Sequence, residues 1–309
     1  MRNSLKVIAI MFVILLASVA APAQSGGVSL KPVLKPGQEA RYRLIAEIDT
    51  EITAAGANGI RGNQSRELNA TVLLRAGVAA PQLTAQAATD ASAATGEVVY
   101  YEAIVEMLDA RLKVNGVESS VIFHNGVAQK IEFAVDAAGR IVKCSIPAEE
   151  AKAGLAELLF SMLDWAPAAP LTVGQSWGNR SGGDSPAGDY GYISAAALSD
   201  VPRSAKTAYR LSAVNGGLAI VEGAVALRQE GATRVAIPAA QTDLNLTASG
   251  DGTTRIEYDV AAGHVVSAVT ESMLKGRVVN IPPTRAGEPM QPREGALVET
   301  AKFSIKLLQ

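Results

Sequence analysis

The residues that could do chemistry in this chain are few, and a serine in a glycine-rich stretch is the first of them. Ser185 lies between Gly182 and Gly188 and follows Asp184 directly, a setting that could present a hydrolase nucleophile. Such a serine needs a histidine base, an orienting carboxylate and backbone amides that bind the oxyanion. His124 is the histidine upstream, and no upstream carboxylate stands out as its partner. A glycine-rich surface loop is the simpler interpretation, and hydrolysis at Ser185 is the third of three functions considered.

The other ligand-type side chains are too scattered for a metal or cofactor site. His124 and His264 are the only histidines, both beside predicted turns, and Cys144 is the only cysteine. A zinc site takes three or four Cys, His or carboxylate ligands. No glycine-rich phosphate loop links a strand to a helix either. We therefore expect no catalytic residue, no metal and no cofactor, in a protein that is not an enzyme.

The first 23 residues are typical of a secretory signal peptide. Arg2 and Lys6 give a positive start, residues 7–17 form an apolar run, and an Ala-x-Ala cleavage site ends at Ala23. The run is shorter than the roughly 20 residues of a membrane-spanning helix. A lone cysteine excludes an internal disulfide and favours a bacterial protein. We expect an exported, soluble protein of the periplasm or the extracellular space, with no transmembrane segment after signal removal.

Charge and aromatic content exclude two further classes. The chain has 28 Lys and Arg against 30 Asp and Glu, a net charge of −2, without a basic block that could cover phosphates. Aromatic residues make up 5% of the chain, whereas outer-membrane barrels carry aromatic girdles at both membrane interfaces. We expect no nucleic-acid partner, and the composition argues against an outer-membrane barrel.

Two short motifs recur in each half of the chain, in the same order. A Gly-Gln pair followed by an aromatic residue occurs at residues 37–42 and again at 174–177. Further on, the segment at residues 135–142 matches that at 258–266, and both contain an Asp followed by a small-residue turn and Gly. Matches in fixed order predict two copies of one β-rich unit.

Most of the chain predicts antiparallel strands. The apolar residues at 38–53 alternate with polar ones, which is typical of a half-buried strand. Asn-Gly pairs at 115–116 and 125–126 predict tight hairpin turns, because both residues tolerate a positive φ. The Gly-Asp-Gly segment at 250–252 predicts another turn. Turns at this spacing indicate an antiparallel meander.

One amphipathic helix is predicted among these strands, at residues 147–165. It ends a first β unit of residues 24–166, and residues 167–309 form the second unit, either separate or fused with the first into one domain. In the second unit, a Pro-, Arg- and Glu-rich segment at 281–295 predicts a surface loop or flap before a last strand at 301–307. The fold class is mainly β: two similar antiparallel meander units, as curved sheets or an incomplete barrel, with the helix on the concave face.

The apolar stripe of this helix and two tryptophans form the candidate binding site. A curved sheet of small residues leaves a void that the helix only partly fills, and such a void would take an acyl chain or an apolar peptide. Core packing is the ordinary alternative for the same side chains. The candidate lining residues are Leu155, Leu158, Leu159, Met162, Trp165 and Trp177.

The Gly-Gln motifs also carry a family resemblance. With Gly-Gln-x-x-x-Tyr at 37–42 and Val-Gly-Gln-x-Trp at 173–177, the chain resembles an uncharacterised family of exported bacterial two-repeat β-proteins. The resemblance spans most of the mature chain and implies no activity. A sheet wrapped around a helix is similar, more loosely, to the periplasmic lipoprotein carriers.

These observations together predict a binding or structural protein. We expect a non-enzymatic envelope protein that binds a lipid, another apolar ligand or the hydrophobic segment of another exported protein by burying apolar surface. The alternative is a structural or adaptor protein of the cell envelope without a ligand cavity. It would bind another envelope protein through exposed sheet edges.

Overall fold

The structure is a computed structural model, and it describes the greater part of the predicted sheet. The described residues are 27–31, 34–54, 61–77, 98–136, 141–144, 155, 158–160, 165–167, 169–178, 201, 203–237, 240–281 and 292–308. The predicted signal peptide, Met162 and Ser185 lie outside them, and of His124 and Cys144 the backbone alone is described.

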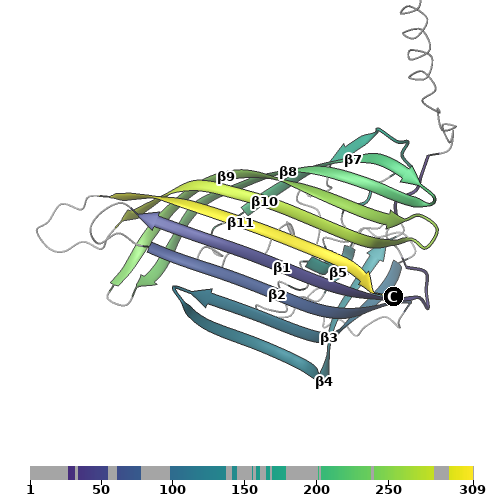
Figure 1. Ribbon diagram of the computed structural model, residues 1–309, viewed down its shortest axis with the longest axis horizontal. Coiled ribbons are helices and arrows are strands. Elements are labelled where there is room, and N and C mark those ends of the chain that lie inside the picture. Colours follow the sequence, from purple (N-terminus) through teal and green to yellow (C-terminus); the bar gives the residue numbers. More distant parts are fainter. Residues whose placement is uncertain are drawn as a thin grey trace, which may run out of the picture.

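Eleven strands form one antiparallel sheet (Figure 1). The strands are β1 (Glu39–Ala54), β2 (Arg61–Ala76), β3 (Val98–Val114), β4 (Val117–Asp136), β5 (Ile141–Cys144), β6 (Ser176–Gly178), β7 (Arg203–Asn215), β8 (Leu218–Ile237), β9 (Ala240–Asp259), β10 (His264–Ile281) and β11 (Arg293–Leu308). Their order in the sheet is β5-β4-β3-β2-β1-β11-β10-β9-β8-β7-β6. Each half is thus a meander, and the halves join where β1 pairs with β11. The predicted mainly β, antiparallel fold is confirmed.

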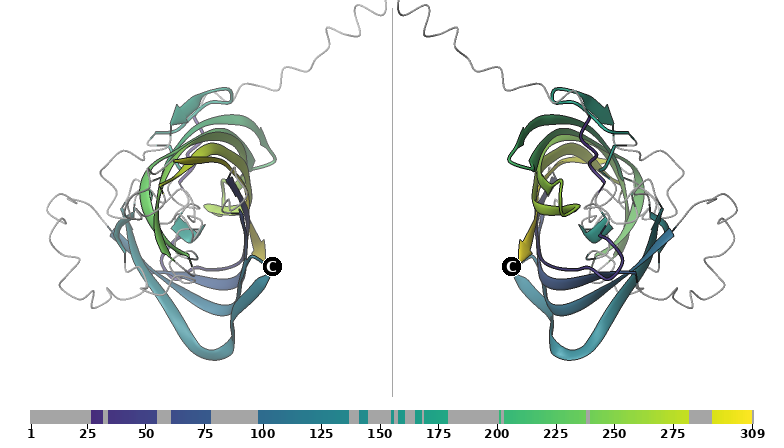
Figure 2. Two further views of the ribbon diagram at one scale, coloured as in Figure 1. Left: turned by 90° about the vertical axis from the view of Figure 1, so that its left-hand side faces the viewer. Right: turned by 90° about the vertical axis from the view of Figure 1, so that its right-hand side faces the viewer.

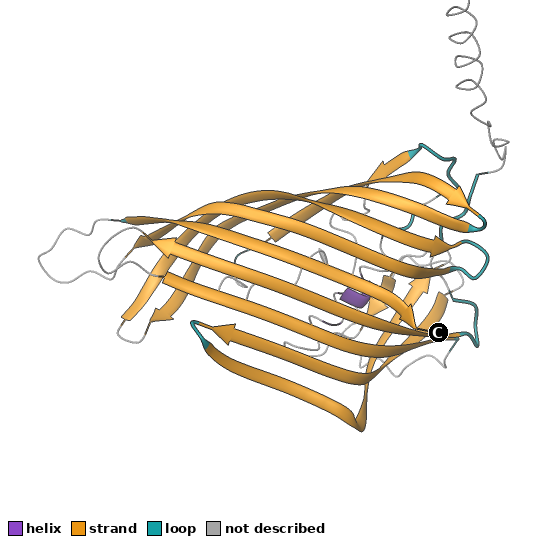
Figure 3. Ribbon diagram, in the orientation of Figure 1, coloured by secondary structure: helices purple, strands orange, loops and turns teal. Residues whose placement is uncertain are grey.

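The sheet is strongly curved and open, with β5 and β6 at its two ends. Viewed end-on, it bends around an interior that holds a short helical segment (Figure 2, and purple in Figure 3). Side chains on each strand alternate between the two faces. On β1, Tyr42 and Leu44 are buried inside while Arg41 and Arg43 are exposed outside.

The predicted helix is present at the few of its residues that the structure describes. Leu155 and residues 158–160 are helical and buried on the concave side of the sheet, whereas Trp165 lies in a turn. The remaining positions of 147–165 lie outside the described residues.

The turn predicted at Gly250-Asp251-Gly252 is wrong, because these residues lie within β9. A Cβ atom at Gly250 would lie 2.7 Å from Leu274 Cα, and one at Gly252 would lie 2.6 Å from Ser272 Cβ. Strands β9 and β10 approach too closely there for any side chain. The glycines therefore allow the sheet to curve, as glycine kinks do in curved sheets. They do not reverse the chain.

Of the two Asn-Gly pairs, only the first forms the predicted hairpin. Asn115 and Gly116 have φ angles of 50° and 87° between β3 and β4. The second prediction is wrong, because β4 continues through residues 125–126. Val105 pairs with Gln129 and Met107 with His124, so the extra residues form a bulge opposite a single residue of β3. The chain therefore continues as one strand with an irregular register at Asn125 and Gly126, and does not reverse there.

The predicted loop at 281–295 is also too long. β10 includes Ile281, and β11 begins at Arg293, well before the predicted start of the last strand at Ala301. Glu299 explains the error: it occupies an inward position between buried Leu297 and Ala301 and interrupts the apolar alternation.

The two Gly-Gln motifs form the same turn. In the first, the amide of Lys35 donates to Gln38 Oε1 at 2.8 Å; in the second, the amide of Thr172 donates to Gln175 Oε1 at 2.7 Å. The glycine between them has a φ of 82° in the first and 93° in the second. The two motifs therefore share one local geometry, while the duplication of the two halves and their division at residues 166 and 167 remain predictions.

Candidate apolar binding site

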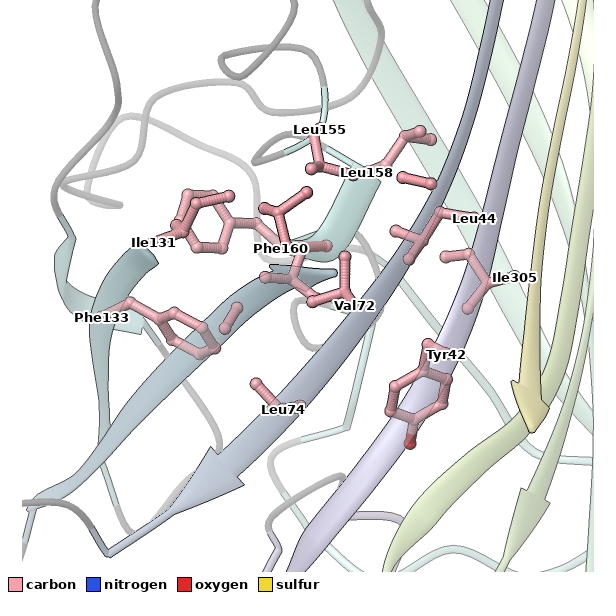
Figure 4. Close-up of a cluster of buried hydrophobic side chains, with 14 of the residues drawn as sticks. Tyr42, Leu44, Val72, Leu74, Ile131, Phe133, Leu155, Leu158, Phe160 and Ile305 are labelled. Carbon is pink, nitrogen blue, oxygen red and sulfur yellow. The ribbon is translucent and has the colours of Figure 1, made fainter. Parts of the chain in front are cut away.

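The concave face around the helical segment is lined by apolar side chains. Leu155 and Leu158 lie beside Leu44 of the sheet, and Phe160 lies on the side of Ile131 and Phe133 (Figure 4). This helix cluster draws on β1, β2, β3, β4 and β11 as well as the helical residues. Leu155 and Leu159 are completely buried. Three of the six predicted lining residues, the leucines, therefore lie together.

Aromatic rings connect the helical segment to the strands. Phe160 meets Phe133 of β4 edge to face at a centroid distance of 5.3 Å, and Phe133 stacks on Tyr101 of β3 at 5.0 Å. Edge-to-face and stacked pairs of this kind add about 0.5–1.5 kcal/mol beyond area burial. The helical segment is thus held against one wall of the curved sheet.

The two tryptophans belong to a different group, the tryptophan cluster. Trp177 Nε1 donates to the carbonyl oxygen of Trp165 at 2.7 Å, and Trp165 meets Tyr258 edge to face at 5.7 Å. Buried residues of this cluster are Leu30, Trp165, Leu211, Ala219, Val221, Ile256, Tyr258 and Val265. The sequence-predicted site therefore divides into two parts, and its role as a cavity lining remains a prediction.

An N-terminal segment, the strap of residues 27–31 and 34–35, contacts both of these clusters on the concave face. The backbone of Val28 pairs with that of Leu171 at 2.7 and 2.9 Å. Tyr258 donates to the carbonyl oxygen of Lys31 at 2.5 Å, and Tyr101 donates to that of Leu34 at 3.3 Å. Tyr258 is on β9 and Tyr101 on β3, with four strands between them in the sheet. The strap is held by hydroxyl groups from two separate walls.

Tyr258→Phe tests whether these hydroxyl groups fix the strap. The variant removes one hydrogen bond and keeps the ring, so we expect the local opening energy of the strap to fall by about 1 kcal/mol. Hydrogen exchange at the Val28 amide measures it. Tyr100→Phe is the matched control, because alternation along β3 directs Tyr100 away from Tyr101. Unchanged exchange in Tyr258→Phe would contradict the role.

A buried ion pair crosses the concave face near Thr50, at the opposite end of β1 from Tyr42. Arg203 of β7 and Glu299 of β11 meet at 2.8 Å between Nη1 and Oε1, and their side chains are 6% and 3% exposed. Arg203 Nη2 also donates to Glu299 Oε2 at 3.0 Å and to Gln229 Oε1 at 3.1 Å. Thr50 Oγ1 donates to Glu299 Oε2 at 3.3 Å. The pair therefore joins β7 to β11 and β1.

This ion pair requires the curl of the sheet. Four inter-strand steps separate β7 from β11, an arc of about 19 Å at about 4.8 Å per step, and the two side chains could not meet across a flat sheet. The inward positions next to Arg203 along the register are Gln229, Ala248 and Gly276, and the last two are small. Small residues let the strands bend and leave room above them for the ion pair.

The outward face is different in chemistry, because exposed ion pairs link its strands. Arg41 of β1 pairs with Glu106 at 2.8 Å, and Lys302 of β11 pairs with Glu271 of β10 at 2.8 Å. Exposed pairs contribute little to stability. They do mark this face as one that contacts water.

A separate polar cavity of about 410 Å³ lies where β1 and β2 meet the β3–β4 turn. It is lined by Glu51, Ile52, Thr53, Asn63 and Asn115. None of the six predicted lining residues borders it, and one apolar side chain among five does not suit an apolar ligand.

The described residues add no metal chemistry to the site. No group of three His, Cys, Asp or Glu side chains in the described ranges is arranged to hold a metal ion. His264 is the first residue of β10, directly after the repeated turn, and is half-buried. Among the helical residues that the structure describes, none forms a segment long and apolar enough to cross a membrane.

The sequence prediction missed the tyrosines, the strap and the buried ion pair. Alternation along β1 already placed Tyr42 on the apolar face, and this pattern could have identified it as a buried tyrosine. Glu299 lies at an inward position of its strand, and a charged residue there could have indicated a buried ion pair. No pattern near Arg203 or Leu30 indicated a buried contact.

Comparison with solved structures finds distant similarity. Neither a protein-family model nor a curated protein matches the chain, so the predicted family resemblance stays a prediction. A solved structure of lipovitellin, described for its lipid–protein interactions, aligns with a TM-score of 0.45 and 10% identity, covering 90% of this chain and 26% of that one. An outer membrane channel from Pseudomonas putida F1 aligns with a TM-score of 0.20 and 8% identity over 89% of this chain and 97% of that one. Similarity at this level carries no information about function.

Proposed function

We propose that this protein is a non-enzymatic, exported envelope protein that binds an apolar ligand on the concave face of its sheet. The observation that carries the proposal is the contrast between the faces. The inward positions form apolar clusters across the sheet, whereas the outward positions carry exposed ion pairs. An open sheet with an apolar inside and a charged outside suits a water-soluble carrier of apolar cargo.

Small inward side chains are interspersed among large ones, which supports a face that can adapt to a ligand. Ala40, Ala46, Ala70, Ala103 and Ala301 all lie buried in the helix cluster beside larger neighbours. In the proposal, the helical segment occupies the concave face in the absence of ligand. Leu155, Leu158, Leu159, Met162, Trp165 and Trp177 line the site. Each CH₂ group of a ligand that enters such a face contributes about 0.8 kcal/mol.

The direct test is native mass spectrometry, with lipid extraction, of protein purified gently from the envelope of its host. A lipid or apolar molecule that co-purifies at fixed stoichiometry is the expected result and identifies the cargo. A bare chain that also fails to bind an apolar fluorescent probe contradicts the proposal.

Leu159→Asp tests the helical segment as part of the site. Leu159 is completely buried among apolar side chains, and an unpaired carboxylate there opposes both helix docking and ligand binding. We expect the variant to lose probe binding while circular dichroism still reports the β-sheet. Val269→Asp is the control, since Val269 is an exposed residue of β10. Unfolding of the whole sheet in Leu159→Asp would place the helical segment in an obligatory core.

A structural or adaptor protein is the second candidate function, and two observations favour it. The helical leucines are buried as completely as the residues of an ordinary core. Among the described strands, β5 covers β4 only at Phe133–Val135, and the rest of that side of β4 has no strand beside it. An uncovered strand edge can pair with a strand of another protein. Crosslinking in the envelope that captures one partner at β4, without bound lipid, would favour this function.

A further inference from the structure

Three glycines form a crease between β9 and β10. Three successive inward pairs across the two strands each contain one glycine: Ala248 with Gly276, Gly250 with Leu274, and Gly252 with Ser272. A Cβ atom at Gly276 would lie 2.6 Å from Ala248 Cα, and Cβ atoms at the other two glycines would meet β10. In a flat sheet, side chains stand roughly perpendicular to the plane and clear the neighbouring backbone. The three pairs therefore mark a line along which the sheet bends sharply.

The part of the sheet beyond this crease, the arm, folds over the concave face. The arm comprises residues 203–206 of β7, 225–237 of β8 and 240–252 of β9. In Figure 1, the green ends of β8 and β9 pass behind β11 and β1. Apolar side chains from both sides of the crease meet there in the arm cluster, whose buried members are Ile52, Val201, Val225, Leu227, Leu244, Leu246, Ala248, Leu274, Val278 and Leu297.

The Arg203–Glu299 ion pair is the latch that joins the arm to the other side of the crease. Arg203 belongs to the arm and Glu299 to β11, so the pair spans the β9–β10 line. Arg203 Nε is buried and has no hydrogen-bond partner among the described residues. A buried donor without an acceptor raises the free energy of the state that buries it. The closed arm therefore carries a cost that contact with water would remove.

The latch differs in chemistry from the apolar cluster around it. Contact with water is unfavourable for apolar side chains, whereas Arg203 and Glu299 would regain the hydration that burial removes. A buried ion pair thus holds one geometry without the stability that apolar residues of similar volume often provide. At the crease, each inward pair lacks one side chain, so no two side chains interlock across the strands there. Bending along this line therefore disturbs little packing.

We propose that the arm is a hinged lid, which turns on the glycine crease and is latched closed by Arg203 and Glu299. The open arm exposes the arm cluster to solvent and gives the concave face an entrance at this end. The movement of the arm is independent of the proposed function. The use of this entrance by an apolar ligand rests on that function.

Pulsed electron paramagnetic resonance on the full chain measures the movement directly. Spin labels at Glu230→Cys of the arm and Asp49→Cys of β1, both exposed positions, report the distance across the latch. Cys144→Ser removes the native thiol. A second pair of labels, at Glu47→Cys of β1 and Glu118→Cys of β4, is the control, because both positions are exposed and lie on the same side of the crease.

Two variants of the latch should separate in this measurement. Glu299→Gln leaves the Arg203 charge buried without its counter-ion, so we expect a distance across the latch that is longer by about 5 Å, one inter-strand spacing. Arg203→Met with Glu299→Leu should keep the short distance, because apolar residues gain nothing from water. The control distance should stay the same in both. Circular dichroism confirms folding, and Arg203→Lys, which loses the planar fork, serves if Glu299→Gln does not fold.

The remaining outcomes contradict separate parts of the inference. Equal distances across the latch in Glu299→Gln and the double variant would show that the ion pair is no latch. A control distance that lengthens as well would show that the whole sheet loosens, without a hinge at the crease. Uptake of an apolar fluorescent probe at one rate in all variants would place the entrance elsewhere. An arm that opens in a protein that binds no probe would support the lid and contradict the proposed function.

Discussion

Replacing Glu299 by alanine is expected to lower the free energy of unfolding by about 3–5 kcal/mol. The change leaves the Arg203 guanidinium, 6% exposed, without its carboxylate, and removal of one partner of a buried ion pair has a cost of about this size. It also leaves Thr50 without the acceptor for its hydroxyl. Chemical denaturation followed by circular dichroism measures the loss.

The matched control is Glu271→Ala. Glu271 pairs with Lys302 at the same 2.8 Å, but both side chains are more than half exposed, so stability should change little. A double variant, Arg203→Met with Glu299→Leu, should recover most of the loss, because apolar residues of similar volume replace a buried pair well. Equal losses in Glu299→Ala and Glu271→Ala would show that the buried pair does not brace the sheet.

Gly250→Val is expected to destabilise the protein by about 3 kcal/mol or to prevent folding. A Cβ atom at Gly250 would lie 2.7 Å from Leu274 Cα, and backbone of a neighbouring central strand cannot move aside as a flexible side chain can. Overpacking of this kind costs about 1–3 kcal/mol or more, and valine adds two methyl groups to the clash. Thermal unfolding measures the effect.

Gly62→Val provides the comparison for a strand glycine without a close neighbour. The nearest atom to a Cβ at Gly62 is Asn115 Oδ1 at 3.9 Å, so valine, which favours strands, should be tolerated there. If both variants lose the same stability, the approach of β9 and β10 is not what requires glycine at 250.

The fold was predictable where local chemistry and tertiary structure agree. The alternation along β1 and the Asn115-Gly116 turn each have one low-energy solution, and the chain adopts it. Glycine was ambiguous, because it permits a turn and also permits close approach of two strands. At 250–252 the second use applies, and only the neighbouring strand reveals it.

The candidate site was predictable in part. The helical leucines follow from a period that the sequence displays. The strap contacts and the ion pair do not, since Lys31 lies 227 residues from Tyr258 along the chain and Arg203 lies 96 residues from Glu299. Contacts at such separations depend on the curvature of the whole sheet, which no local pattern encodes.

The pairing of β1 with β11 has a consequence for the order of folding. Tyr42, near the start of the chain, pairs with Leu307, near its end. A chain that is made or threaded from its N-terminus cannot close the middle of its sheet until the last strand has arrived. Until then β1 and β10 each keep an uncovered edge, which is a hazard for aggregation. Contacts of such long sequence separation also slow folding. An arrangement of this kind therefore favours aggregation between copies of the chain until β11 has paired with β1.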